Sequence, residues 1–215
     1  MMVRKRVGAF FIDMLLVSLL AITLSGLSYL NPYKEKYEKV TDEYKEVLYE
    51  YQSVLTSEGS SSITNLKVLN EYLNTSIIPV LKNIEKYSIF YSLWYLIVYF
   101  LYFGIFTFFN DGQTLGKKIF KIRVVNKGSN KLSFNRVLRR CLINGTSLYY
   151  GINIILIFRI LSTFINDTYI FTNTYFILEF LSIALELSLV ISLFFSKGTR
   201  LTNDLFAQTE IIEAK

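Results

Sequence analysis

The chain has 215 residues, 52% of them hydrophobic, and a formal net charge of +6 from 23 basic and 17 acidic residues. The single cysteine, Cys141, excludes a disulfide within the chain, and the absence of histidine removes the commonest metal ligand and acid–base catalyst. The apolar residues gather in runs of about 20, which is typical of membrane-spanning helices rather than of a soluble core.

The first predicted element is an apolar run at residues 7–30, which follows a basic head at residues 4–6. A helix of this length reaches about 36 Å, enough to cross a bilayer core of about 30 Å. We therefore predict that residues 1–30 form a basic N-terminus and a retained transmembrane helix, not a cleaved signal peptide. Asp13 lies inside this helix, where an ionisable group costs about 2.5–3.5 kcal/mol at the bilayer centre. We expect Asp13 to need a partner from another segment.

Residues 31–86 are predicted to form a helical hairpin outside the bilayer. Between residues 33 and 54, Tyr and Val recur at alternating intervals of four and three, which is typical of a helix that packs on another helix. The run Glu-Gly-Ser-Ser-Ser at residues 58–62 predicts a turn, and Pro79 predicts a kink in the helix that follows. Two interpretations remain open: a solvated spacer, or a module that binds a protein partner.

Three further transmembrane helices are predicted. Residues 87–109 lack charge and are rich in aromatic side chains, so this second span is expected to have a structural role. Residues 142–195 contain the third and fourth spans, at 142–165 and 174–195, joined by a short outer loop. The predicted fold class is an all-α membrane protein with four transmembrane helices and an extracytoplasmic helical hairpin inserted between spans 1 and 2.

The connector at residues 110–141 carries nine basic residues against Asp111, whereas residues 31–86 contain more acids than bases. Because Lys and Arg near span ends favour the cytoplasmic side, we predict a cytoplasmic N-terminus, connector and C-terminal tail (residues 196–215), with the hairpin outside. The membrane thereby explains the net positive charge, which does not indicate nucleic-acid binding.

Two local features of these basic segments are predicted. Thr114 is expected to cap a short helix that lies at the headgroup boundary. The apolar face expected for this helix consists of Leu115, Ile119 and Ile122, and the opposite face consists of Lys117, Lys118 and Lys121. The tail ends in a short apolar run at residues 209–212, which is expected to lie on the membrane or on the connector.

Asp13 has several candidate partners. They are Arg139 or Arg140 where the third span begins, Lys117 or Lys118 in the connector, or a group of the tail. One interpretation is that Asp13 only locks helices together, and the other is that it binds a cation or proton in a polar cleft open to the cytoplasm. Arg6 is expected to reach the headgroups. For Asp204 in the tail, the simpler expectation is a surface pair with an arginine.

Two charged groups are predicted to meet toward the outer side. Arg159 in the third span and Glu179 in the fourth should lie at similar depths and form an ion pair. Glu186 shares a helix face with Glu179 and lies near mid-membrane. Because acids inside a membrane mark ion or proton pathways, Glu186 is interpreted either as a proton relay or as a neutral, hydrogen-bonded carboxyl.

Several motifs occur together in the chain. They are Arg6-x-x-Ala9-x-x-x-Asp13, Thr114-Leu115-Gly116-Lys117-Lys118, Ile122-Arg123-Val124-Val125, Arg139, and Asn203-Asp204-Leu205-x-Ala207-x-Thr209. In these motifs the chain resembles the RDD family of bacterial membrane proteins. The resemblance covers residues 6–30 and 96–212 and leaves out the hairpin, which looks like an insertion. It implies that the family's arginine and two aspartates correspond to Arg6, Asp13 and Asp204. The family usually has a glycine where this chain has Gln208.

The resemblance implies an integral protein of the bacterial cell membrane that is suspected in transport, with cation/proton antiport suggested for some members, and it implies no enzyme activity. We therefore expect transport of a small cation or proton, with Asp13, Glu186 and Glu179 as candidate carriers. Four spans are few for an autonomous transporter, so a homodimer or larger assembly is expected. The alternative is a non-catalytic membrane scaffold whose hairpin binds a partner. Neither hypothesis requires a cofactor or a metal.

Overall fold

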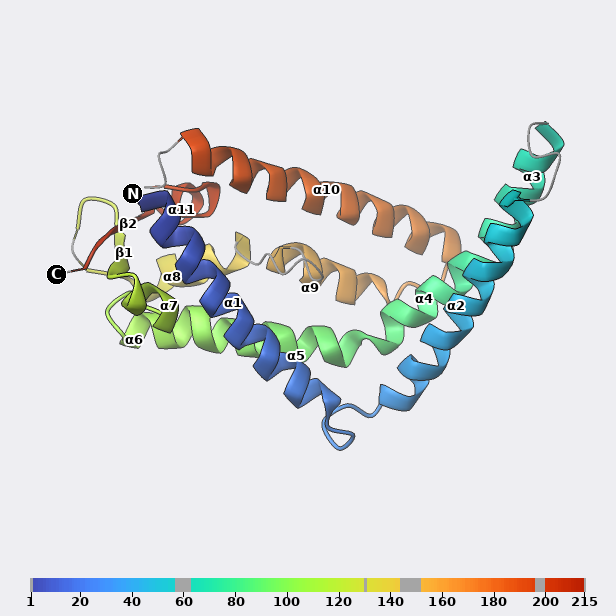
Figure 1. The fold of residues 1–215 in the computed structure, drawn as a ribbon, viewed down its shortest axis with the longest axis horizontal. Coiled ribbons are helices and arrows are strands. Elements are labelled where there is room, and N and C mark those ends of the chain that lie inside the picture. Colours follow the sequence, from blue (N-terminus) through green and yellow to red (C-terminus); the bar gives the residue numbers. More distant parts are fainter. Residues whose placement is uncertain (1, 57–62, 130, 144–151, 196–199, 215) are drawn as a thin grey trace.

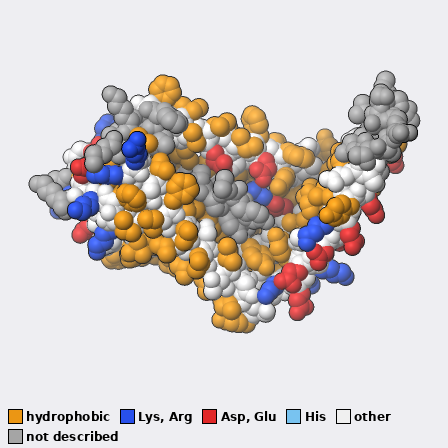
Figure 2. All heavy atoms as spheres, in the orientation of Figure 1, with side chains coloured by type: hydrophobic (Ala, Val, Ile, Leu, Met, Phe, Trp, Pro, Cys, Tyr) orange, Lys and Arg blue, Asp and Glu red, His pale blue; other side chains and the backbone are white. Residues whose placement is uncertain are grey.

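The structure, a computed structural model, describes residues 2–56, 63–129, 131–143, 152–195 and 200–214. It is mostly helical, and its long helices run between two ends (Figure 1). Both chain termini lie at one end, and the hairpin helices lie at the other. Hydrophobic side chains cover much of the surface between the ends, and most charged side chains on the visible face lie toward the ends (Figure 2). This distribution suits a protein that crosses a bilayer.

Three helices among the described residues are long and apolar enough to cross a membrane, judged by length and composition. They are α1 (Met2–Gly26), the segment Ile89–Phe109 formed by α5 (Ile89–Tyr99), η2 (Phe100–Phe106) and α6 (Thr107–Phe109), and α10 (Thr168–Phe195). The first and second predicted spans are therefore confirmed as apolar helices of spanning length.

The helix predicted as the fourth span begins earlier than expected, at Thr168 rather than at residue 174. Asp167 explains the difference, because its Oδ1 accepts the N–H of Ile170 at 2.9 Å, as an N-cap does. With 28 residues, α10 is about 42 Å long at about 1.5 Å per residue. The helix is therefore longer than the bilayer core is thick.

The third predicted span is described only in part. α8 (Phe134–Ile143) and α9 (Asn153–Ser162) fall within or beside it, whereas residues 144–151 lie outside the described part of the chain. α9 is apolar but has only ten residues, too few to cross a bilayer core alone. The Asn153 amide donates to the Cys141 carbonyl at 2.8 Å, so α9 begins beside α8. The count of four spans stays a prediction.

The hairpin helices pack along each other away from the termini (Figure 1). α2 (Lys34–Thr56) leads away from α1, and α3 (Ile63–Tyr72), η1 (Leu73–Ile77) and α4 (Ile78–Tyr87) return. Tyr72 stacks on Tyr51, with 6.0 Å between ring centroids, and donates its hydroxyl to Glu50 at 2.7 Å. Pro79 lies in the first turn of α4, directly after the π-helical η1, so the helix is irregular near the expected kink. The turn predicted at residues 58–62 lies outside the described residues.

The all-α prediction is wrong at the end that holds the termini. There β1 (Ile122–Asn126) of the connector pairs antiparallel with β2 (Thr209–Glu213) of the tail, after the short helix α11 (Thr202–Ala207). Val124 lies opposite Ile211, and both are buried. The expectation of Ile122 on a helix face failed because this residue belongs to a strand, in which sides alternate with every residue. The tail therefore lies on the connector, one of the two expected places.

The main hydrophobic core lies between the long helices and packs α1 against α5, η2, α8 and α9. Its buried members include Val17 of α1, Tyr99 of α5, Phe103 of η2, Val137 of α8 and Leu156 of α9. A smaller cluster around Ala9, Ile122, Val124 and Ile211 joins α1 to the sheet. The sheet is thus attached directly to the first helix.

Ending the chain after Gln208 should destabilise the fold, because β2 carries Ile211 into the cluster that covers α1. Burial of one isoleucine side chain is worth about 1.5–3 kcal/mol, and the strand hydrogen bonds are lost as well. We expect the detergent-solubilised protein to melt several degrees lower, followed by circular dichroism. A chain that ends after Glu213 keeps every strand pair and is the control. Equal melting temperatures of the two truncations would contradict this role for β2.

Candidate functional site

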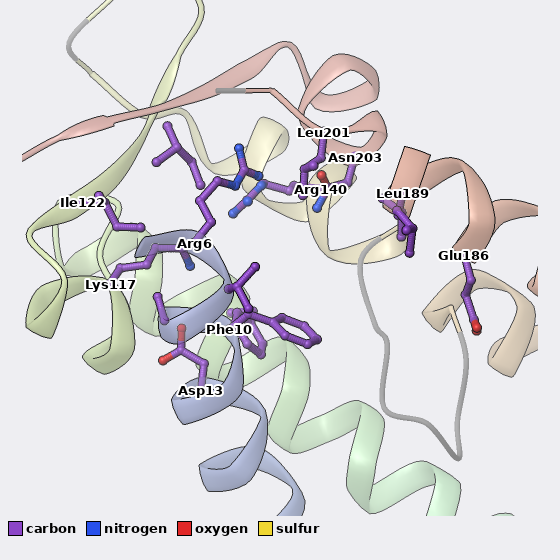
Figure 3. Close-up of a pocket in the computed structure, with 15 residues that line it drawn as sticks. Arg6, Phe10, Asp13, Lys117, Ile122, Arg140, Glu186, Leu189, Leu201 and Asn203 are labelled. Atoms are coloured by element: carbon purple, nitrogen blue, oxygen red, sulfur yellow. The ribbon is translucent and has the colours of Figure 1, made fainter. Parts of the chain in front are cut away.

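A cavity of about 350 Å³ lies at the end of the molecule that holds the termini. Its walls come from α1, η2, α7 (Leu115–Ile119), β1, α8, α10 and the tail. Its polar lining consists of Arg6, Asp13, Lys117, Arg140, Glu186 and Asn203 (Figure 3). Small-molecule pockets usually have about 300–1,000 Å³, so the cavity is large enough for a small ligand.

Asp204 joins three helices through two buried arginines. Its Oδ2 accepts from Arg6 Nη2 of α1 at 2.6 Å, and its Oδ1 accepts from Arg140 Nε of α8 at 2.8 Å. The Leu201 N–H at 3.0 Å and the Thr209 hydroxyl at 3.2 Å donate to the same carboxylate. Asp204 is 0% exposed. The expected surface pair is therefore a buried one, and Arg6 does not extend to the headgroups.

The charge of Asp204 is secured by its partners. Burial alone would raise the pKa of this carboxyl, but Arg140 and Arg6 favour the charged form and bring the pKa to about 2. Asp204 therefore stays ionised throughout the physiological range of pH. The link between α1, α8 and α11 is permanent under those conditions.

Asp13 is bound by neutral donors. Its Oδ1 accepts from the Tyr102 hydroxyl at 2.7 Å and from the Gly116 N–H at 2.8 Å, and its Oδ2 accepts from the Thr114 hydroxyl at 2.5 Å. Asp13 thus meets the start of α7, where backbone N–H groups lack partners within the helix. The expectation of a charged partner is wrong for the residues named for it, which were Arg139, Arg140, Lys117 and Lys118.

Gly116 is required by this contact. A Cβ atom on residue 116 would lie 2.3 Å from the Ala9 carbonyl oxygen of α1 and 2.8 Å from Asp13 Oδ1. Only glycine lets the backbone of α7 come close enough for its N–H to reach Asp13. Thr114 and Gly116 of the connector motif therefore both serve the same carboxylate.

The short helix α7 is present, with Thr114 as its N-cap, and one residue of the expected lysine face, Lys117, is buried while Lys118 is exposed. Leu115 and Ile119 are exposed, whereas Lys117 is only 6% exposed. Hydrogen bonding of Asp13 to the start of α7 sets this orientation. The exposed Leu115 and Ile119 can contact lipid, and the Lys117 side chain turns into the cavity (Figure 3).

Lys117 is a buried amine that is not directly paired with a carboxylate among the described residues. It donates to the Thr114 hydroxyl at 3.3 Å and lies 5.4 Å from the Phe103 ring centroid, and the described residues give it no ion pair within 4.0 Å. Burial, and then the repulsion of Arg140, lower the pKa of Lys117 to about 7. This amine therefore changes charge near neutral pH, which the sequence did not indicate.

Arg139, which the resemblance singled out, is exposed, and its neighbour Arg140 is buried in the pair with Asp204. Consecutive residues of a helix point about 100° apart, so a shift of one residue exchanges the buried face for the exposed one. Of the two arginines at the start of the predicted third span, Arg140 and not Arg139 therefore takes part in the buried cluster.

At the hairpin end, the expected pair of Arg159 and Glu179 is confirmed, with 2.9 Å between Nη1 and Oε1. Arg159 also pairs with Glu85 of α4 at 2.7 Å and lies 5.1 Å from the Tyr175 ring centroid. The sequence did not indicate Glu85 as a partner, although the predicted topology places the base of the hairpin beside the outer ends of the third and fourth spans. Glu179 has a partner here and does not line the cavity.

Glu186 lines the cavity from α10, on the side away from Lys117 (Figure 3). Its Oε1 accepts the Ser182 hydroxyl at 3.2 Å, and among the described residues it forms no ion pair. These contacts are compatible with both interpretations, a proton relay and a neutral, hydrogen-bonded carboxyl. Of the three acids predicted as carriers, Asp13 and Glu186 share the cavity.

These features define a helical membrane protein in which buried charges tie the first helix to the connector and the tail. The RDD family model matches residues 2–208, so the chain belongs to the RDD family, whose members are membrane proteins. The expected insertion of the hairpin stays a prediction. No curated protein and no solved structure matches the chain. Gln208 has a left-handed φ of 54°, which accounts for the glycine that the family usually has there.

Replacing Asp204 with Asn should strongly destabilise the fold. The change leaves Arg6 and Arg140 buried without a carboxylate, and removing one partner of a buried ion pair costs about 3–5 kcal/mol. We expect a clear drop in the melting temperature of the detergent-solubilised protein. The control is Asp42→Asn, which breaks only an exposed pair with Lys45 on α2. Similar melting temperatures of the two variants would count against a central role for Asp204.

The stability of the protein should rise with pH above neutrality because of Lys117. The pKa of this amine is about 7 in the folded chain against an ordinary value of 10.5, so the unfolded chain binds more protons between these values. The difference in melting temperature, wild type minus Lys117→Met, should therefore increase as the pH is raised from about 7 to about 9.5. Lys118→Met, which changes an exposed neighbour, should follow the wild type. Parallel curves for all three proteins would refute the prediction.

Proposed function

We propose that this protein carries protons across a membrane, as a multi-pass transporter or as a subunit of one. The observation that supports this best is that Lys117 and Glu186, two groups able to exchange a proton, line one cavity among the helices. Lys117 changes charge near neutral pH, and Glu186 is hydrogen-bonded to Ser182. Ionisable groups inside a membrane protein are costly, and they commonly mark such pathways.

A proton suits this cavity better than a metal cation does. Arg6, Lys117 and Arg140 line it, and a metal ion would meet their repulsion at low dielectric. A proton instead binds covalently to an amine or a carboxylate, so it does not need a cluster of acidic ligands. Of the two transported species that the sequence suggested, a small cation or a proton, we therefore propose the proton.

The structure also reduces the number of residues that we propose as proton carriers. Asp13 accepts hydrogen bonds from three donors, and Glu179 is paired with Arg159 outside the cavity. We assign both carboxylates to holding helices together. Glu186 remains as a carrier, and Lys117 is added to it.

We further propose that the protein lies in a bacterial cell membrane with both termini and the connector in the cytoplasm and the hairpin outside. This orientation is supported by the gathering of the N-terminus, connector and tail at one end and of the acidic hairpin at the other (Figure 1). The cavity occupies only the end with the termini. A homo-oligomer would extend the pathway through the rest of the bilayer, and no enzyme activity is included in the proposal.

Proton flux into liposomes that contain the purified protein and a pH-sensitive dye tests the proposal. Glu186→Gln and Lys117→Met should each lower the flux by at least about tenfold, the scale on which a positioned proton carrier acts. Glu43→Gln and Lys118→Met, at exposed residues, should keep the wild-type flux. Wild-type flux no faster than that of empty liposomes, or full flux in both cavity variants, would overturn the proposal.

The alternative function, a scaffold whose hairpin binds a partner, is supported by the reach of the hairpin. α2 and α3 project beyond the other helices (Figure 1). The base of the hairpin is held in the fold, because Glu85 pairs with Arg159 and Lys82 donates to the Asn166 carbonyl at 2.7 Å. A partner would therefore contact the distal half of the hairpin.

A further inference from the structure

We propose that the cavity binds a single-chain anionic amphiphile, with its carboxylate or phosphate head against Lys117, Arg6 and Arg140 and its alkyl chain between α1 and α10. This inference rests on the proposed function, since Lys117 would take up the proton that accompanies the anion. It adds a substrate class to the proton pathway.

The charges at one end of the cavity support an anionic head. Arg6 and Arg140 share Asp204, and the donors to Asp13 among the described residues are neutral. With Lys117 neutral, the two arginines balance the two aspartates. With Lys117 protonated, these five described groups carry one positive charge in excess, and a monoanion would compensate it. Glu186, the remaining acid of the lining, lies at the other end of the cavity (Figure 3) and does not pair with them.

The arrangement of the basic side chains in the cavity also supports an anionic head group. Arg6, Lys117 and Arg140 are all less than a tenth exposed, yet all three line the cavity. Figure 3 shows that they come from three different elements and converge at its end away from Glu186. Lys117 carries three N–H donors and gives one to Thr114, and Arg140 carries five in a planar fork and gives its Nε–H to Asp204. These two residues can therefore donate to an anionic head, and Arg6 adds its positive charge.

The remaining lining supports an alkyl chain. Most of it is apolar, with Val7 and Phe10 on α1 and Leu189 and Val190 on α10. Val7 is 36% and Val190 is 54% exposed, so this wall continues to the protein surface. At about 350 Å³ the cavity is near the small end of ligand pockets, which favours one short chain over a whole phospholipid.

The proton accompanies the anion through Lys117. The titratable and charged groups that act on this amine are Arg6 and Asp13 from α1 and Arg140 and Cys141 from α8. An anion near the amine favours its charged form, so binding above neutral pH takes a proton from solution. The amphiphile would then enter the cavity as an anion with its charge compensated.

Equilibrium dialysis of labelled octanoate tests the site, with the full chain in neutral-lipid nanodiscs at about pH 6.5, where Lys117 is mainly charged. We expect saturable binding above that of empty nanodiscs. Octyl phosphate should compete, whereas acetate, inorganic phosphate and octanol should compete at least about tenfold more weakly, because each lacks the chain or the charge. Lys117→Met should weaken binding of octanoate at least about tenfold, and raising the pH to about 8.5 should weaken it in the wild type only.

The matched control is Lys118→Met, which should bind octanoate as the wild type does. Competition by octanol equal to that by octanoate, full binding by Lys117→Met, or no saturable binding above empty nanodiscs would each overturn the proposal. The measurement uses no proton gradient, so it separates the two claims. Octanoate binding without proton flux supports this site and removes the proposed function, whereas proton flux without octanoate binding removes this site alone.

Discussion

The interaction on which the rest of the structure depends is the buried carboxylate of Asp204 between Arg6 and Arg140. Isolated charges cannot remain in an apolar interior, because the loss of hydration costs several kcal/mol per ion. Each of these three groups is therefore stable only while the other two are present. Since they come from α11, α1 and α8, their pairing requires the tail, the first helix and the connector to meet at one place.

A second carboxylate organises the same end of the molecule by a different means. Arg6, Ala9, Asp13, Val17 and Ala21 form one buried face of α1, at helical spacing. Asp13 uses this face to bind the start of α7, where Thr114 and Gly116 supply neutral donors, and the Tyr102 hydroxyl of η2 supplies a third. The family motifs thus have one physical purpose here. The residues of these motifs hold the connector and the tail against the N-terminal half of α1.

The sequence predicted the long apolar helices and the packing of the hairpin, because hydrophobic length and heptad spacing are strong signals. It predicted the Arg159–Glu179 pair, because both groups lie at the outer ends of adjacent predicted spans. It did not predict the pairing of β1 with β2, since two five-residue strands far apart in the chain carry little local signal. The third span stays a prediction, because residues 144–151 lie outside the described part of the chain.

The errors within the candidate site have two causes: a partner was inferred from charge alone, and the rotation of short helices could not be read from the sequence. Asp13 was expected to pair with a positively charged side chain, but it accepts hydrogen bonds from a backbone N–H and two hydroxyl groups. Arg140 rather than Arg139 faces Asp204, because one residue of rotation separates them on α8. Lys117 was expected on a solvated face, but the hydrogen bonds of Asp13 turn it inward.

The position of Lys117 follows from these structural bonds, and it is also what gives the site its chemistry. Once Asp13 and Asp204 are occupied by their own donors, neither can closely pair the amine that α7 directs into the cavity. The buried amine then lies near two guanidinium groups, and both its burial and their repulsion disfavour its charged form. Among the described residues of the cluster, the arginines are paired with Asp204, and Lys117 is the basic group without an ion pair. That group, lining the same cavity as Glu186, is where a proton and an anion can be coupled.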